Sequence, residues 1–170
     1  MSTLSVSIEL EHPLELLLSC HDKVRYFSAL TDRLADHVRQ HGVDAEASQA
    51  AVNILRYFEL ALPNHHADEE KDVFPALGTL NDAAVNSAIA TLLAEHVRLD
   101  KEWCELHPWL RRVAQGVAQQ DEVPSGTASF AWAYMAHAEH EEHTVFPAIE
   151  RLPPETVASL ANSMRARRGG

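Results

Sequence analysis

The chain has 170 residues, 46% of them apolar, which suffices for the core of one domain. Its 25 acidic residues outnumber its 14 Lys and Arg residues, and the formal net charge is −11. This charge disfavours nucleic acid and anionic membrane surfaces as partners. No apolar run approaches the ~20 residues of a membrane span, and the N-terminal segment lacks the basic start and apolar core of a signal peptide. We therefore expect a cytoplasmic protein.

Glycine is rare, and the long stretches between glycines are rich in Ala, Leu, Glu and Arg, which favour helices. The first helix is predicted from Pro13 to about His41, with Gly42 as its stop. The second is predicted over about 44–77. Pro63 lies inside it and should kink or split it, because proline cannot donate the helical hydrogen bond.

A third helix is predicted from about Asn81, a good N-cap residue, to about Gln115, and Pro108 should bend or interrupt it. The fourth should begin after Gly126 and run through Val145. A pair of prolines then breaks the chain, and a last short helix is predicted over about 155–167.

Apolar residues recur at helical spacing in all four long helices, so each helix should bury one face against the others. Short connections between long helices imply antiparallel neighbours. The sequence therefore predicts an all-α fold, an up-down-up-down four-helix bundle over about 13–150 with a short C-terminal fifth helix. We expect residues 1–170 to form a single domain.

The second half of the chain repeats the first. Residues 65–77 align with residues 137–149, and seven of the thirteen positions are identical. Each segment contains a His-x3-Glu motif followed by Phe-Pro, and an earlier helix in each half carries one histidine within an apolar stripe. The six residues are His21, His65, Glu69, His96, His137 and Glu141.

All six lie on stripes that should face the bundle interior, and residues four apart share a helix face. Buried imidazoles and carboxylates need partners, so a metal site is the favoured interpretation, with a hydrogen-bonded polar core as the alternative. This donor set suits non-haem iron, with manganese or zinc as substitutes. Two bridging carboxylates would allow two ions, with positions left for an oxide or hydroxide bridge and an external ligand.

The order His, His-x3-Glu, His, His-x3-Glu, with Phe-Pro after each pair, resembles the hemerythrin-like (HHE cation-binding) domain family over about residues 10–150. The resemblance implies a di-iron centre (Fe2+/Fe3+) held by the same six residues, with Glu69 and Glu141 as bridging ligands. The chain departs from the oxygen-carrying members, since Asp100 replaces a histidine ligand and Glu142 stands in place of an aspartate ligand. These departures argue against simple reversible oxygen storage.

The expected function is to bind, sense or handle O2, NO, peroxide or iron, with a small diatomic or azide-like anion as the ligand. One alternative is a di-iron oxidase or peroxidase-type enzyme, and another is a regulatory bundle with a structural metal. Such oxidases use Glu-x-x-His motifs. The reversed His-x3-Glu order therefore favours a binding protein over an enzyme with turnover.

Other polar residues receive structural interpretations. By their positions in the repeat, His66, His140 and His143 are assigned to the surface or to the surroundings of the site, and Asp68 is taken as solvated. Tyr134 is assigned to core packing, with a hydrogen bond to an iron-bound oxygen as the alternative.

Aromatic residues, cysteines and the C-terminal arginines are treated as groups. The aromatic side chains expected in the core are Trp103, Trp109, Phe130 and Trp132. Cys20 and Cys104 are taken as small buried side chains, since two cysteines make neither a disulfide framework nor a zinc motif. Arg165, Arg167 and Arg168 are expected to form a solvated tail.

Overall fold

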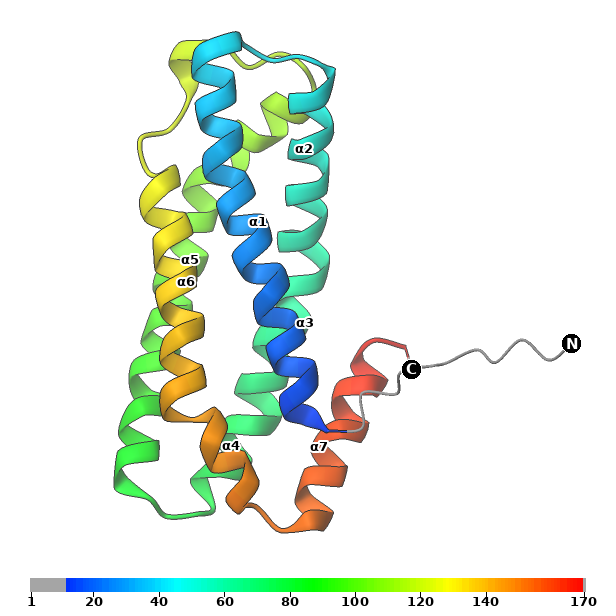
Figure 1. The fold of residues 1–170 in the computed structure, drawn as a ribbon, viewed down its shortest axis with the longest axis vertical. Helices are drawn as coiled ribbons and strands as arrows, with labels where there is room; N and C mark the ends of the chain where they lie inside the picture. The colour runs from blue at the N-terminus through cyan, green and yellow to red at the C-terminus, as the bar shows by residue number, and fades with distance from the viewer. Residues whose placement is uncertain (1–11, 170) are drawn as a thin grey trace, which may run out of the picture.

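The computed structural model describes residues 12–169, so the prediction that the N-terminus carries no signal peptide lies outside the described part. Four long helical segments run along the long axis in alternating directions (Figure 1). They are α1 (Pro13–His41), the segment from α2 (Ala45–Arg56) to α4 (Phe74–Gly78), α5 (Ala83–Ala114) and α6 (Thr127–Thr144). The shorter α7 (Pro154–Arg167) follows, and the predicted all-α bundle with a fifth helix is confirmed.

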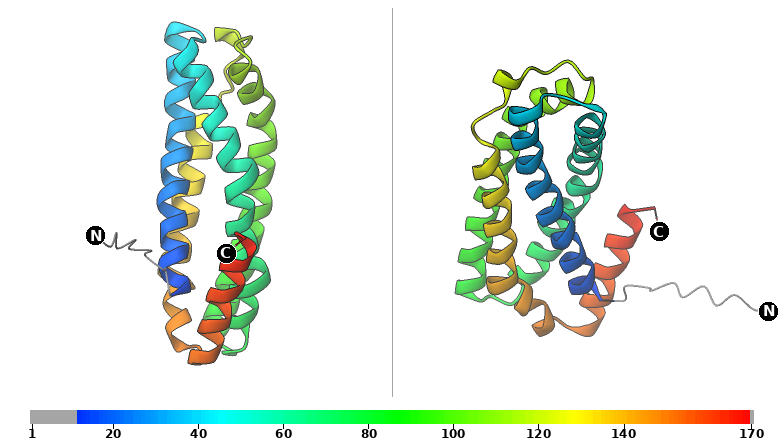
Figure 2. Two further views of the ribbon diagram at one scale, coloured as in Figure 1. Left: turned by 90° about the vertical axis from the view of Figure 1, so that its right-hand side faces the viewer. Right: turned by 45° about the horizontal axis from the view of Figure 1, so that its top comes forward.

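The four segments close into a ring. Helix α1 packs against α2 and α6, and α5 packs against the same two helices from the other side. Figure 2 shows this arrangement from two further directions, with α7 folded back beside the start of α1. Within residues 12–169, every helix lacks the combination of length and apolar character that a bilayer span needs.

Helix α1 has the predicted bounds, and its ends show why. His12 precedes the helix in an extended conformation, and its Nδ1 accepts a hydrogen bond from the Leu14 backbone N–H at 3.2 Å. Pro13 occupies the first helical position, where a missing N–H costs nothing. Gly42 ends the helix with φ at 77°, a left-handed conformation that glycine adopts without steric penalty.

The second long segment is not split at Pro63. Two π-helical stretches, η1 (Tyr57–Ala61) and η2 (Asp68–Val73), flank α3 (Leu62–Ala67). Each stretch comes just before a proline, Pro63 or Pro75, whose ring would collide with the carbonyl four residues back in a regular helix. The wider turn avoids this collision, because the first N–H after each stretch bonds five residues back. The predicted kink is therefore a π-segment, and the second one was not predicted.

Helix α5 differs from prediction at two places. Asp82, not Asn81, is the N-cap, and its carboxylate accepts from the backbone N–H groups of the second and third helical residues. Asn81 instead adopts a left-handed conformation with φ at 54°. The predicted interruption at Pro108 is wrong, because α5 continues through it. Pro108 and Cys104 are both exposed, so water can solvate the carbonyl that the proline leaves free.

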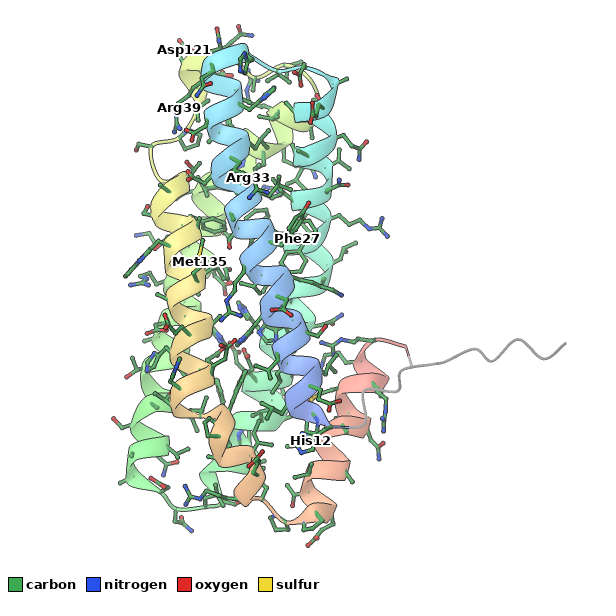
Figure 3. The ribbon with its side chains drawn as sticks, viewed as in Figure 1. His12, Phe27, Arg33, Arg39, Asp121 and Met135 are labelled. Atoms are coloured by element: carbon green, nitrogen blue, oxygen red, sulfur yellow. The ribbon has the colours of Figure 1, made fainter. Side chains whose placement is uncertain are left out.

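The apolar core forms two clusters, one toward each end of the bundle, and side chains fill the space between the helices (Figure 3). Leu34, Leu55 and Phe130 belong to the cluster near the α1–α2 connection, and Leu17 and Ile149 belong to the cluster near α7. Buried histidines and carboxylates lie within the same interior. The fold thus encloses polar groups in an otherwise apolar core.

Several core assignments require correction. Trp109 and Phe130 are buried and Trp103 is partly buried, as expected, but Trp132 is 69% exposed. Cys104 is exposed and Cys20 is partly buried, so the prediction of two buried thiols is wrong for Cys104. Trp132 is two residues from both Phe130 and Tyr134, and residues two apart do not share a helix face, so helical spacing places it on the outward face of α6.

Candidate metal centre

The fold brings all six predicted donors into one buried cluster. His21 comes from α1, His65 from α3 and Glu69 from the π-segment η2. His96 comes from α5, and His137 and Glu141 come from α6. Every one of the six side chains is 4% exposed or less.

The donors form two overlapping groups. One group is His21, His65, Glu69 and Glu141, and the other is His96, His137, Glu69 and Glu141. Within each group the donor atoms all lie within 4.8 Å of one another. The two glutamates belong to both groups, while each group has its own pair of histidines.

The carboxylate oxygens are divided between the two groups. Oε1 of Glu69 lies 3.1 Å from Nε2 of His65, and its Oε2 lies 3.3 Å from Nε2 of His96. Oε2 of Glu141 lies 3.0 Å from Nε2 of His21, and its Oε1 lies 3.2 Å from Nε2 of His137. Each carboxylate therefore presents one oxygen to each group, as a bridging ligand of two cations must.

Many of these inward-facing atoms have no hydrogen-bond partner among the described residues. They are both oxygens of Glu69, Oε1 of Glu141, and Nε2 of His96 and His137. Buried polar atoms are almost always satisfied in native proteins, and exceptions need an explanation. A cation between imidazole nitrogens and carboxylate oxygens would satisfy all five atoms, so the residues present fit a metal site.

Three of the four imidazoles also contact a carboxylate on their outer side, through Nδ1. The pairs are His21–Glu142 at 2.8 Å, His96–Glu70 at 2.7 Å and His137–Glu95 at 2.7 Å. Such a contact fixes the ring so that Nε2 faces the centre and raises its basicity. Sequence reasoning missed these roles, although the doubled Glu-Glu in each repeat was the available signal for Glu70 and Glu142.

Without a bound cation, two of the four imidazoles, His21 and His96, are protonated at neutral pH. Burial opposes protonation of His21 and His96, but the adjacent carboxylates of Glu141 and Glu69 outweigh it and raise the pKa of His21 to about 10 and that of His96 to about 11. Burial and the neighbouring His21 instead hold the pKa of His65 well below its usual value. Protonated rings thus balance the buried carboxylates, and a metal must displace those protons.

Two further histidines border the cluster. The ring of His66 stacks on that of His96 with centroids 4.1 Å apart, and burial lowers the pKa of His66 to about 3, so it is neutral. Nδ1 of His140 lies 3.1 Å from Glu95. His143 is exposed, and its Nδ1 lies 2.7 Å from the backbone carbonyl oxygen of Glu139 on its own helix.

Asp100 and Tyr134 lie outside both groups of donors. Asp100 is exposed, and the protein around its carboxyl displaces enough water to raise the pKa of that group. Tyr134 is buried against Phe58, and its hydroxyl has no hydrogen-bond partner among residues 12–169. With His66, both line a cavity of about 360 Å³ beside the cluster. Tyr134 therefore packs in the core as expected and also lines that cavity.

The prediction that Asp68 is solvated is wrong, since its side chain is 0% exposed. Arg168 donates to Asp68 at 2.6 Å, and Arg167 bonds both Asp68 and Asp72. The solvated tail predicted for these arginines is therefore wrong as well. Both predictions failed because of a tertiary contact. Helix α7 folds back over η2 and places both guanidinium groups on the segment that carries Glu69.

Comparisons with known proteins identify a family. The family model of the hemerythrin HHE cation binding domain matches residues 12–149, which include all six donors. An uncharacterised protein of Haemophilus influenzae is 31% identical over 156 residues, covering 92% of this chain and 90% of the relative.

Proposed function

Because the chain belongs to the hemerythrin HHE cation-binding domain family, we propose that it holds two iron ions and binds a small diatomic or anionic molecule there, O2, NO, peroxide or an azide-like anion. The proposed ligands are His21, His65, Glu69, His96, His137 and Glu141. Glu69 and Glu141 would each supply oxygen ligands to both ions. Zinc or manganese are the substitutes that the same donors would accept.

The observation that carries this proposal is the division of the carboxylate oxygens. Glu69 and Glu141 each direct one oxygen to one pair of histidines and the other oxygen to the other pair. A mononuclear site needs no such sharing. A hydrogen-bonded polar core would not leave both oxygens of a fully buried glutamate without a partner.

The number of donors supports ligand binding. Four imidazole nitrogens and four carboxylate oxygens fill about eight of the roughly twelve positions that two six-coordinate ions offer. Bound iron would supply redox chemistry and Lewis acidity at the remaining positions. The chain itself supplies orientation, since Glu142 holds His21 and is in turn bonded by Arg25 at 2.9 Å. The apolar clusters restrict water from the site.

The test is an anaerobic iron(II) titration of the metal-free protein. We expect about two irons per chain, as two donor groups require. Glu69→Ala should lose most of the iron, because Glu69 contacts both groups. His143→Ala is the matched control on α6 and should bind as the unmodified chain does. One iron or none in the unmodified chain would overturn the dinuclear site.

The same loaded protein separates the alternatives. A change in its absorption spectrum on adding azide or NO supports an open coordination position. No change would favour a metal that only stabilises the bundle. Catalytic oxidation of a substrate beyond one equivalent per centre would favour an oxidase or peroxidase.

The proposed compartment is the cytoplasm, and nucleic acids and membranes are not proposed as partners. Cys20 and Cys104 are free thiols in the part of the chain that the structure describes, which suits a reducing compartment.

A further inference from the structure

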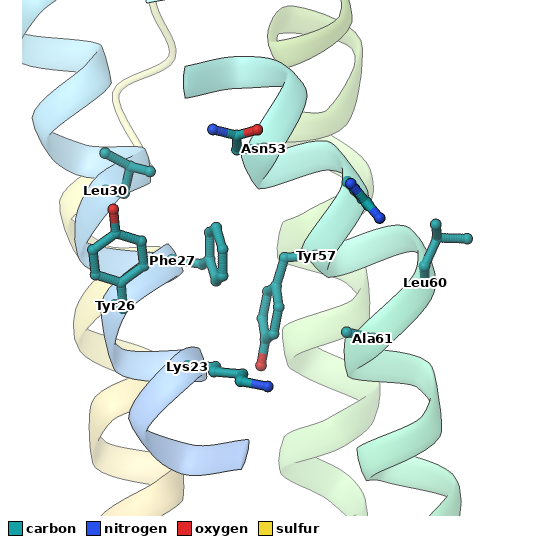
Figure 4. A pocket seen from close by; sticks show the side chains of 9 residues that line it. Lys23, Tyr26, Phe27, Leu30, Asn53, Tyr57, Leu60 and Ala61 are labelled. Atoms are coloured by element: carbon teal, nitrogen blue, oxygen red, sulfur yellow. The ribbon is translucent and has the colours of Figure 1, made fainter. Parts of the chain in front are cut away.

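A groove of about 560 Å³ opens between α1 and the α2–η1 segment (Figure 4). None of the six proposed metal ligands lines it. Its α1 wall includes Phe27 and Leu30, and its opposite wall includes Tyr57 and Leu60. The volume lies within the range of about 300–1,000 Å³ that is typical of small-molecule sites.

The base of the groove is aromatic. The rings of Phe27 and Tyr57 stack with centroids 4.4 Å apart and an interplanar angle of 12°. At the rim, Tyr26 is 56% exposed and Leu60 is 64% exposed, although large apolar side chains are usually buried. Exposed apolar surface gathered at a concave site is typical of ligand binding.

The charge of the groove is opposite to that of the molecule. Lys23 on α1 and Arg56 at the end of α2 stand on its two walls, and no acidic side chain lines it. Within residues 12–169, neither cation belongs to an ion pair, whereas several other arginines do. In a chain of net charge −11, two uncompensated cations around an apolar base mark a local preference for an anion.

We propose that this groove binds a small aromatic carboxylate. The flat ring lies against Phe27, Tyr57 and Leu60, and the carboxylate meets Lys23 and Arg56. The size favours a small molecule, and the lack of acidic lining excludes organic cations. Binding requires no metal, so this site is independent of the proposed iron centre.

The test uses calorimetric titration of the full chain with naphthoate, in metal-free and metal-loaded forms. As a probe of charge, the neutral naphthalenemethanol presents the same ring without the carboxylate. Naphthoate should bind at a single site per chain, equally in both forms. The alcohol should bind about tenfold more weakly or worse, which is the usual effect of losing a charged hydrogen bond.

Variants assign the binding to the groove. Lys23→Gln with Arg56→Gln should weaken naphthoate binding by about tenfold or more and remove its advantage over the alcohol. The matched control is Arg33→Gln with Lys101→Gln, which removes the same two charge types from exposed positions outside the groove. The control should bind naphthoate as the unmodified chain does. Leu60→Glu, at an exposed position, should also abolish binding without disturbing the core.

Three results would overturn the proposal. The first is equal binding of naphthoate and the alcohol. The second is naphthoate binding that survives the loss of both Lys23 and Arg56. The third is that naphthoate fails to bind while sedimentation shows a dimer that Leu60→Glu dissociates. The groove would then be covered by a second copy of the chain.

Discussion

Glu95 and Cys20 occupy equivalent positions in the two halves of the chain, since Glu95 directly precedes His96 and Cys20 directly precedes His21. Glu95 lies 2.7 Å from Nδ1 of His137. The equivalent nitrogen of His65 is buried without a hydrogen-bond partner among the described residues. An outer carboxylate orients an imidazole ligand and makes it a stronger donor. The two groups of donors are therefore unequal, and the group with His137 should hold its metal more tightly.

The first prediction concerns this asymmetry. Glu95→Ala should weaken one of the two metal sites by about 10–100-fold, because it removes the carboxylate behind His137. Cys20→Ala is the control at the equivalent position and should leave both affinities nearly unchanged. Cobalt(II) titration followed by absorption distinguishes the two sites. Equal weakening of both sites by Glu95→Ala would contradict the assignment of Glu95 to one group.

The second prediction concerns pH. His21 and His96, with pKa values of about 10 and about 11 in the metal-free protein, are both protonated at neutral pH. Metal binding must therefore release their protons, so affinity rises with pH, by up to about a hundredfold per unit when two protons leave. Calorimetry in buffers of different ionisation enthalpy counts the protons. Binding without proton release would show that the two rings are neutral before metal enters.

The same shifts affect the stability of the metal-free fold. Both values lie above the ordinary histidine value of 6.5, so protonation stabilises the folded state. This contribution is fully present below about pH 6.5 and is lost as the pH rises through about 10 and about 11. Raising the pH therefore strengthens metal binding while it weakens the metal-free bundle.

At the scale of the helices, the sequence predicted those helix ends that are determined by residues within one turn of the end. Pro13 and Gly42 define α1 because an N-terminal proline and a left-handed glycine act within one turn. The two Phe-Pro pairs show the limit of such signals. The pair at Pro75 continues into α4 after a π-segment, whereas the pair at Pro147 follows the end of α6 and begins the 3-10 helix η4 (Phe146–Arg151). The surrounding fold, and not the dipeptide, decides between these outcomes.

The candidate site was predictable for a similar reason. A His-x3-Glu spacing fixes which residues share a helix face, so the donors could be named without knowing how the helices pack. The partners of Asp68 could not be named. Arg167 and Arg168 lie about a hundred residues further along the chain, and only the docking of α7 brings them to η2.

This docking connects the end of α7 to the candidate metal centre. Asp68 directly precedes Glu69 in the π-segment η2, and both side chains are fully buried. The two arginines neutralise Asp68, and Arg167 also holds Asp72 at 2.8 Å. We infer that these contacts hold η2 in the conformation that directs Glu69 at the histidines.

The third prediction concerns the loss of the contacts that Arg167 and Arg168 make with η2. Arg167→Ala with Arg168→Ala leaves a buried carboxylate unpaired, a change that costs about 3 kcal/mol or more and lowers Tm by roughly 6–12 °C. Iron affinity should fall as well, because η2 is no longer held. Arg165→Ala is the control, since among residues 12–169 the Arg165 side chain hydrogen-bonds only to Asn162, on its own helix. Adding Asp68→Asn to the double variant should recover part of the lost stability. Unchanged iron binding in the double variant would contradict the inference that α7 positions Glu69.

At the scale of the whole molecule, buried polar groups lie inside a bundle whose apolar core is otherwise divided into two clusters. Two fully buried glutamates would destabilise the bundle if they stayed charged and unpaired. In the metal-free protein, protons on His21 and His96 offset that charge. The bundle should therefore keep its helices without metal, unlike domains whose folding depends on a metal.

The fourth prediction follows from that balance. A ligand present at about a thousand times its Kd stabilises the folded state by about 4 kcal/mol, which corresponds to roughly 8–16 °C in Tm for a chain of this size. Iron-loaded protein should melt higher than chelator-treated protein by this amount. Well below the melting transition, both forms should show the same helical circular dichroism. Glu69→Ala should show no iron-dependent shift. Loss of helix on metal removal would mean that the cation, and not the two apolar clusters, holds the bundle together.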